Sequence, residues 1–111
     1  MNARQIDDLV KRQVGESWDA TNAHGVDLRQ AIQPAEPITI VERSVSGGAA
    51  HDRLIDVWLV LVEVPFSRAG YRIVAAKDGS RFGLASEGLA ADAHLVLCGW
   101  HGDFMTALRA M

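Results

Sequence analysis

Cysteine is almost missing from this chain, because Cys98 is the one cysteine among 111 residues. An internal disulfide is therefore excluded, and the fold must be held together by its core. Long apolar runs are missing too: the longest, 57–62, lies between Asp56 and Glu63 and is far shorter than the roughly 18 residues of a membrane-spanning helix. The first residues also lack the basic-then-apolar order of a secretory signal. We therefore expect a cytoplasmic protein with no membrane partner.

Positive charge is in deficit as well, since 11 Lys and Arg stand against 14 Asp and Glu, for a net charge of −3. Such a chain has no general attraction for a phosphate backbone, so nucleic acid is not expected as a partner. Charged residues make up 23% and apolar residues 49% of the chain, which is the balance of a globular protein and excludes bulk disorder. The length is about that of one ordinary domain, so we expect a single domain over residues 1–111.

What the chain does have is an amphipathic pattern at its N-terminus. Asn2 and Gln5 have the spacing of a capping box, which predicts a helix start. Apolar residues then recur at helical spacing, at Ile6, Leu9, Val10, Val14 and Trp18. Gly15 costs about 1 kcal/mol relative to Ala inside a helix, but the apolar stripe runs past it. The pattern therefore favours a helix that continues to about Asn22.

Two shorter helical segments are predicted further along the chain. Asp27 and Gln30 again have capping-box spacing and predict a short turn over 28–33, which the prolines at 34 and 37 end. Asp103 is placed to cap a C-terminal helix. The apolar side of that helix is formed by Phe104, Leu108 and Met111.

The most informative stretch is a strand over 54–64 that is apolar on both faces. Because side chains alternate along a strand, one face is predicted to carry Val57, Leu59 and Leu61. The other face is predicted to carry Trp58, Val60 and Val62. A strand of this kind has to be covered on both sides. We therefore expect a central sheet with helices packed on its faces.

Four other strands are predicted around it, over 38–44, 71–76, 81–86 and 94–98, with a flexible connection at 47–50. Asp78-Gly79 predicts a type I′ hairpin turn, which pairs Val74 with Gly83. Short connections favour a mostly antiparallel meander of about five strands. The expected fold class is α+β, with an N-terminal amphipathic helix, this sheet and a short C-terminal helix.

The densest polar cluster is the first candidate site. Trp18, Asn22, His24, Asp27 and Arg29 lie within a short segment, and such groups can perform acid/base work or bind an anion. The alternative is that they cap and end helices, with Arg29 as a surface charge.

Cys98 and His101 are the second candidate. Their spacing is that of half a metal site, which His94 can extend, and Cys98 just before a helix N-terminus can also be an activated nucleophile. The alternative is a small buried hydrophobic residue that closes a strand. With no second cysteine and no surrounding signature, we assign no metal site, no cofactor and no catalytic residue.

The outer face of the predicted hairpin is the third candidate. We call the following residues the hairpin face: Arg72, Val74, Ala76, Arg81, Gly83 and Ala85. A smooth apolar patch bordered by arginine is typical of an interaction surface. The alternative is that a helix of the same chain covers it.

These patterns favour a non-enzymatic protein-interaction module that binds an unknown protein partner or itself, as a possible homodimer. The alternative is a small-molecule-binding domain or an enzyme. Its polar site would lie around His24, Asp27 and Arg29, or around Cys98 and His101.

Overall fold

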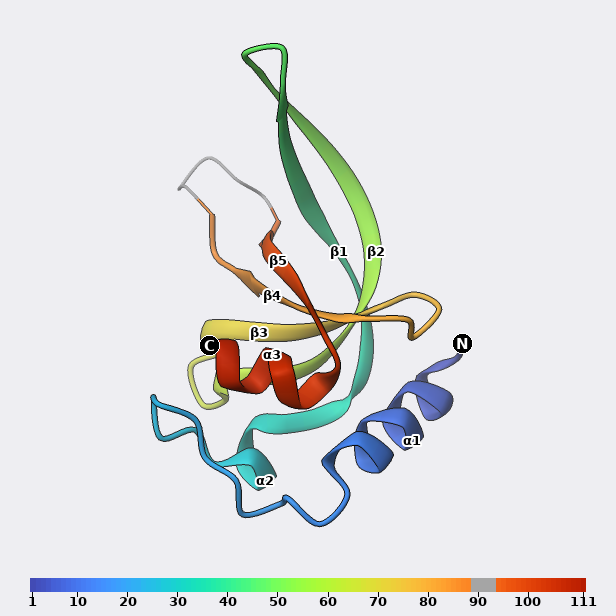
Figure 1. Cartoon of the computed structure of the whole chain (residues 1–111), viewed down its shortest axis with the longest axis vertical. Coiled ribbons are helices and arrows are strands. Elements are labelled where there is room, and N and C mark those ends of the chain that lie inside the picture. The colour runs from blue at the N-terminus through green and yellow to red at the C-terminus, as the bar shows by residue number, and fades with distance from the viewer. Residues whose placement is uncertain (89–93) are drawn as a thin grey trace.

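The computed structural model describes residues 1–88 and 94–111, with the backbone alone at 45, 46 and 50. The elements follow in the order α1 (Ala3–Val14), α2 (Leu28–Ala31), β1 (Ile32–Ser46), β2 (Ala49–Val64), β3 (Ala69–Ala76), β4 (Phe82–Ser86), β5 (Val96–Gly102) and α3 (Phe104–Ala110). The expected α+β class is confirmed: an N-terminal helix, a mostly antiparallel five-stranded sheet and a short C-terminal helix (Figure 1).

The sheet closes on itself into a small barrel, in the order β1-β2-β3-β4-β5. Neighbouring strands are antiparallel except at the closure, where β1 and β5 run parallel and pair at Val41 and Val96. There the Val41 N–H donates to the Leu95 carbonyl at 2.8 Å. Helices were expected on both faces of the sheet, but the second face is covered by the sheet's own curvature.

Two apolar clusters result, one on each side of the β2 backbone. The first joins the outer side of the sheet to all three helices and includes Trp58, Leu61, Phe82 and Phe104, the last two in edge-to-face contact at 5.8 Å. The second lies inside the barrel and contains no helix residue. Its buried members are Ile40, Val57, Leu59, Val62, Val74 and Ala85.

The central strand is buried on both faces over 57–62, whereas Leu54 and Val64 near the ends of the predicted span are exposed. Its two faces also exchange partway along. Val57 and Leu59 point into the barrel, whereas Leu61 lies in the helix cluster beside Val60. The β2–β3 register shifts between Leu59 and Leu61, and such a bulge reverses the side to which later residues point. Leu61 and Val62 were therefore assigned to the wrong faces.

The N-terminal helix begins as predicted but ends earlier. Asn2 and Gln5 form both hydrogen bonds of the capping box, at 2.8 and 2.9 Å. The helix stops at Val14 because Gly15 takes a φ of 58°, and its N–H returns to the Lys11 carbonyl. Glycine adopts a positive φ far more readily than residues with a side chain, so the helix ends here and the expected continuation to Asn22 was wrong.

The first strand is longer than predicted, and the turn Gly47–Gly48 joins it to β2. β1 starts at Ile32 and includes both Pro34 and Pro37, with an irregular register between Ile32 and Glu36. It then pairs with β2 up to Ser46 and Ala49. Beyond the barrel the two strands project as a two-stranded ribbon over 42–54, visible at the top of Figure 1.

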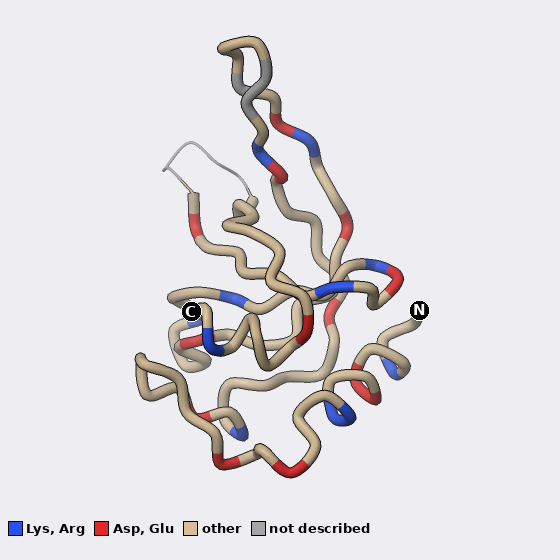
Figure 2. Tube along the Cα trace, in the orientation of Figure 1, with Lys and Arg blue, Asp and Glu red and all other residues tan. Residues whose placement is uncertain are grey.

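The ribbon carries paired charges of both signs (Figure 2). Arg43 binds Asp52 through two hydrogen bonds of 2.8 and 3.0 Å, and Arg53 binds Glu42 on the next rung. Charged side chains along an exposed ribbon discourage pairing with other strands. The ribbon is thus protected from nonspecific association.

The β3–β4 register is confirmed, since Val74 pairs with Gly83 and Arg72 with Ala85. The turn type is not. A type I′ turn requires positive φ at both central residues, yet Gly79 alone has one in this turn, at 73°. Asp78 keeps a negative φ because its carboxylate accepts the Ser80 N–H at 3.0 Å, a local bond typical of aspartate in turns.

The C-terminal part matches its prediction in kind, with shifted bounds. β5 spans Val96–Gly102 and not 94–98, and residues 89–93 before it lie outside the described residues. Asp103 caps α3 through the Thr106 N–H at 2.8 Å. Gln13 of α1 accepts the Phe104 N–H at 2.6 Å, so one helix fixes the start of the other.

Candidate functional site

The predicted polar cluster is dispersed by the fold into separate local roles. Asn22 binds the backbone: its amide donates to the Leu108 carbonyl at 3.2 Å, and its oxygen accepts the N–H groups of His24 and Val26. Asp27 caps α2 through Arg29 N–H, at 3.1 Å, and not through Gln30. These hydrogen bonds support the alternative interpretation, in which the polar residues cap and end helices, because their partners are backbone groups of the same chain.

The other members of the cluster point in different directions. Arg29 pairs with Asp19 on the exposed surface. Trp18 is half-buried and packs against the helix cluster. His24 reaches a different element, with its Nδ1 3.3 Å from Oε1 of Glu63 at the end of β2. The five residues therefore do not line one common site.

His24 and Glu63 form the one acid/base pair that the cluster contributes. They border a shallow pocket of about 270 Å³ together with Asp27, Gln30 and Pro65. The second oxygen of Glu63 already accepts the Tyr71 N–H at 3.0 Å. Because both carboxylate oxygens are engaged within the chain, the pair braces the end of β2.

Most of the hairpin face lies inside the barrel. Val74 and Ala85 are fully buried, Gly83 is buried, and the Arg72 residue is only 7% exposed. Ala76 is half-buried, and Arg81 is exposed with its guanidinium 4.1 Å from the Trp100 ring centroid. Val74 and Ala85 pack with residues of β1, β2 and β5 inside the barrel and not against a helix, so this part of the predicted interaction surface is core.

Cys98 is exposed and not a buried closure of its strand. Its Sγ lies 3.3 Å from the Ser86 Oγ, whereas His101 is half-buried and His94 exposed. Within residues 1–88 and 94–111, no three His, Cys, Asp or Glu side chains lie close enough together to hold a metal ion.

Three carboxylates have lowered pKa values, all for local reasons. The Arg43 side chain lowers the pKa of Asp52, Ser80 lowers that of Asp78, and Thr106 lowers that of Asp103 through hydrogen bonds from its side chain and backbone. Asp52 lies on the β1–β2 ribbon, Asp78 in the β3–β4 turn and Asp103 at the cap of α3. These shifts therefore report structural roles.

Sequence reasoning missed an apolar projection at the β2–β3 turn, which we call the tip (residues 64–71). Phe66 is 94% exposed there, between Val64 at 42% and Tyr71 at 37%. The only sequence signal was an aromatic residue between Pro65 and Ser67, in a segment that has to turn.

The tip is held by groups that are themselves fixed. The buried Arg72 donates to the Gly70 carbonyl at 2.8 Å and to the Arg68 carbonyl. Arg68 has a φ of 53°, which side-chain-bearing residues rarely adopt. Gly70 packs so closely on Glu63 that an added Cβ would lie 2.7 Å from its Oε2. The aromatic ring is thus displayed on a braced turn.

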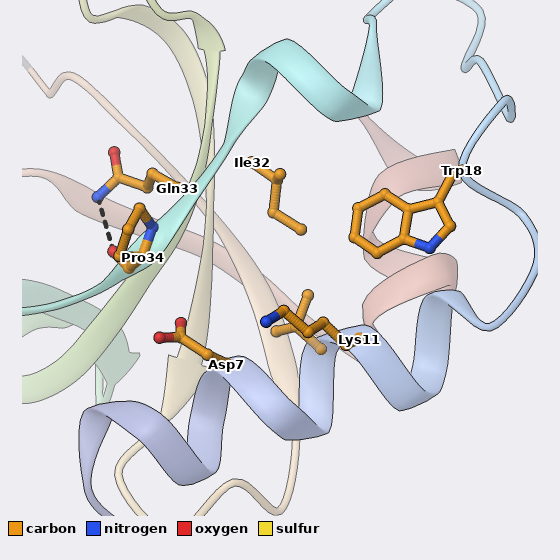
Figure 3. A pocket seen from close by; sticks show the side chains of 7 residues that line it. Asp7, Lys11, Trp18, Ile32, Gln33 and Pro34 are labelled. Carbon is orange, nitrogen blue, oxygen red and sulfur yellow. Dashed lines mark hydrogen bonds between the residues drawn. The ribbon is translucent and has the colours of Figure 1, made fainter.

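Sequence reasoning also missed a pocket between α1 and β1, which we call the α1–β1 pocket (Figure 3). Its volume is about 230 Å³. It is lined by Asp7, Val10 and Lys11 of α1, by Trp18, and by Ile32, Gln33 and Pro34 of β1. Its formation depends on the early end of α1, which turns the chain so that Trp18 faces the first residues of β1.

Comparisons with known proteins give no functional assignment for this chain. The helices of the described residues are too short or too polar to span a bilayer. No protein-family model, no curated protein and no solved structure matches this chain.

Proposed function

We propose that this chain is a non-enzymatic protein-interaction module, and that its tip binds a second copy of the same chain. The observation that carries the proposal is the nearly complete exposure of Phe66, at 94%, on a turn whose conformation is fixed by Arg72 and Glu63. Isolated exposed apolar residues are common. Val64, Phe66 and Tyr71 lie within one short braced segment, and a gathering of exposed apolar residues is typical of a contact surface.

The energetics favour a weak, reversible contact. Full burial of a Phe side chain contributes roughly 1.5–3 kcal/mol, and a two-fold contact buries one from each copy. A Kd of about 1 mM corresponds to about 4 kcal/mol. The fixed turn lowers the ordering cost that a flexible loop would add. Association also costs translational and rotational freedom, so we expect a Kd in the millimolar range.

The charges around the tip are compatible with a contact between identical copies. Arg68 and Glu36 lie 3.5 Å apart beside it, and both are well exposed. In a two-fold interface each surface meets itself. A rim with both signs allows Arg68 of one copy to face Glu36 of the other, so like charges need not oppose each other.

Sedimentation velocity over a concentration series tests the proposal. The wild-type sedimentation coefficient is expected to rise with concentration, and Phe66→Ser is expected to remain at the monomer value. Leu54→Ser is the matched control, because Leu54 is 60% exposed on the ribbon, away from the tip, and is expected to associate like the wild type. A wild type that stays monomeric at the highest soluble concentration overturns the proposal, as does equal association of Phe66→Ser.

A second candidate function, small-molecule binding, is supported by a separate feature, the α1–β1 pocket.

A further inference from the structure

The α1–β1 pocket combines an apolar floor with a polar rim. The side chains of Val10, Trp18, Ile32 and Pro34 supply the apolar lining. The polar groups are Asp7, Lys11 and Gln33 (Figure 3). Small-molecule sites generally have this composition, with few polar groups that fix the orientation of the ligand.

The walls of the pocket are fixed by hydrogen bonds. Asp7 Oδ1 accepts the Ala35 N–H at 2.7 Å and joins α1 to β1. Gln33 donates to Glu36 Oε2 at 3.1 Å. After α1, the Ser17 N–H returns to the Val14 carbonyl at 2.9 Å, which positions Trp18. The pocket is therefore formed before any ligand binds.

Lys11 is the polar lining group whose side chain has no hydrogen-bond partner in the described part of the chain. Its ammonium has no hydrogen bond or ion pair within the described residues, whereas Asp7 and Gln33 both have partners. Figure 3 shows its amine among the lining side chains. The Lys11 ammonium is thus free to bind a ligand, and the group that it binds is an anion.

We infer that the α1–β1 pocket binds a small monocarboxylate with a single apolar ring, its carboxylate on Lys11 and its ring against Trp18 and Ile32. A pocket of about 230 Å³ lies just below the roughly 300–1,000 Å³ of sites for drug-sized ligands, which is the size expected for a one-ring ligand. The indole supplies an aromatic surface for the ring. Asp7, one helical turn before Lys11, disfavours a second negative charge, which selects a monoanion.

Three one-ring probes that differ in charge test this inference: benzoate, benzyl alcohol and benzylammonium. Each is titrated into ¹⁵N-labelled protein, and the three indole N–H resonances are followed, with that of Trp18 assigned from Trp18→Phe. Benzoate is expected to shift the Trp18 resonance in a saturable way and to leave those of Trp58 and Trp100 unchanged. Benzyl alcohol and benzylammonium are expected to bind more weakly.

The variant Lys11→Met removes the charge and keeps the aliphatic chain. It is expected to weaken benzoate binding about ten-fold, the loss typical of a hydrogen bond to a charged group, without weakening benzyl alcohol binding. Arg12→Met is the matched control, because Arg12 is the next residue on α1 and does not line the pocket. Both sites are exposed, and unchanged backbone amide spectra check that the variants fold.

Three results overturn the inference: no probe shifts the Trp18 resonance, benzylammonium binds more tightly than benzoate, or Lys11→Met binds benzoate as the wild type does. The Phe66→Ser variant separates this site from the proposed self-association. It is expected to bind benzoate with wild-type affinity, so either idea can fail without the other.

Discussion

The substitution Gly83→Ala tests the closure of the barrel directly. Gly83 lies on β4 opposite Trp100 of β5. A Cβ at this position would lie 2.6 Å from the Gly99 carbonyl oxygen and 2.9 Å from Trp100 Cε3. The nearest atom belongs to a strand backbone, which cannot rotate away as a side chain can. Strands β4 and β5 therefore have to separate to accommodate one methyl group.

The expected loss of stability is large for such a small change. Overpacking of a core costs about 1–3 kcal/mol, and the rigid neighbour places Gly83→Ala near the upper end. Alanine also lowers the conformational entropy of the unfolded chain relative to glycine, which stabilises the folded state by about 0.4–1 kcal/mol. We expect a net loss of about 2 kcal/mol, against a total of about 5–15 kcal/mol for a small domain.

Urea unfolding measures this loss as a lower midpoint at an unchanged slope. Gly25→Ala is the control for backbone strain, because Gly25 has a φ of 70° but no heavy atom within 4 Å of an added Cβ; a loss of about 1 kcal/mol is expected there. If Gly83→Ala loses less than about 0.5 kcal/mol, the range of ordinary surface substitutions, then β5 does not cross β4 this closely and the reasoning fails.

Three further predictions concern the cap, the tip and its brace. Hydrogen bonds from Thr106 lower the pKa of Asp103 in the folded state below its unfolded value. The ionised carboxylate therefore stabilises the fold at pH values above the unfolded pKa of about 3.9. This contribution is lost as the pH falls through the folded-state pKa. Asp103→Ser, which keeps a cap without a charge, is expected to show a shallower decline of melting temperature in acid, and an equal decline would contradict this. Arg72→Met leaves the carbonyls of Arg68 and Gly70 without their donor and is expected to cost about 1–3 kcal/mol in urea unfolding, with faster hydrogen exchange at Tyr71; an unchanged exchange rate would show that the turn does not need its brace. Phe66→Ser is expected to change monomer stability by less than about 0.5 kcal/mol in dilute thermal melts, and a larger loss would mean that the ring is packed.

Features that depend on a few neighbouring residues were predictable from the sequence. The capping box of α1, the Asp103 cap and the pairing of Val74 with Gly83 follow from fixed local spacings. The burial of the central strand followed from its composition. In each case the relevant atoms lie close together along the chain or on adjacent strands.

Features that depend on distant segments were not predictable in the same way. The bulge at Val60 cannot be recognised from the sequence, because a strand that is apolar on both faces has no polar–apolar alternation for a bulge to interrupt. Closure of the barrel requires β1 to meet β5, far along the chain, and it converts the hairpin face from surface to core. Trp18 and Gly15 illustrate competing local signals, because the apolar stripe favours a continued helix and the glycine ends it.

The candidate site was the least predictable part. Asn22 and Asp27 are residue types that serve equally well as ligand contacts and as caps, and the fold uses them for backbone bonds. The α1–β1 pocket exists because the chain reverses after Gly15, so its lining residues come from segments that no motif connects.

The parallel contact between β1 and β5 makes the barrel unequal around its circumference. In the described part of the chain the two strands are joined at one bridge, Val41 with Val96, whereas every other junction is an antiparallel ladder of several rungs. Local opening is easiest at the strand junction with the fewest backbone hydrogen bonds. Transient separation of β1 from β5 would admit water to Ile40 and Val74 while the remaining ladders stay intact. Solvent can then reach the barrel interior without global unfolding of the chain.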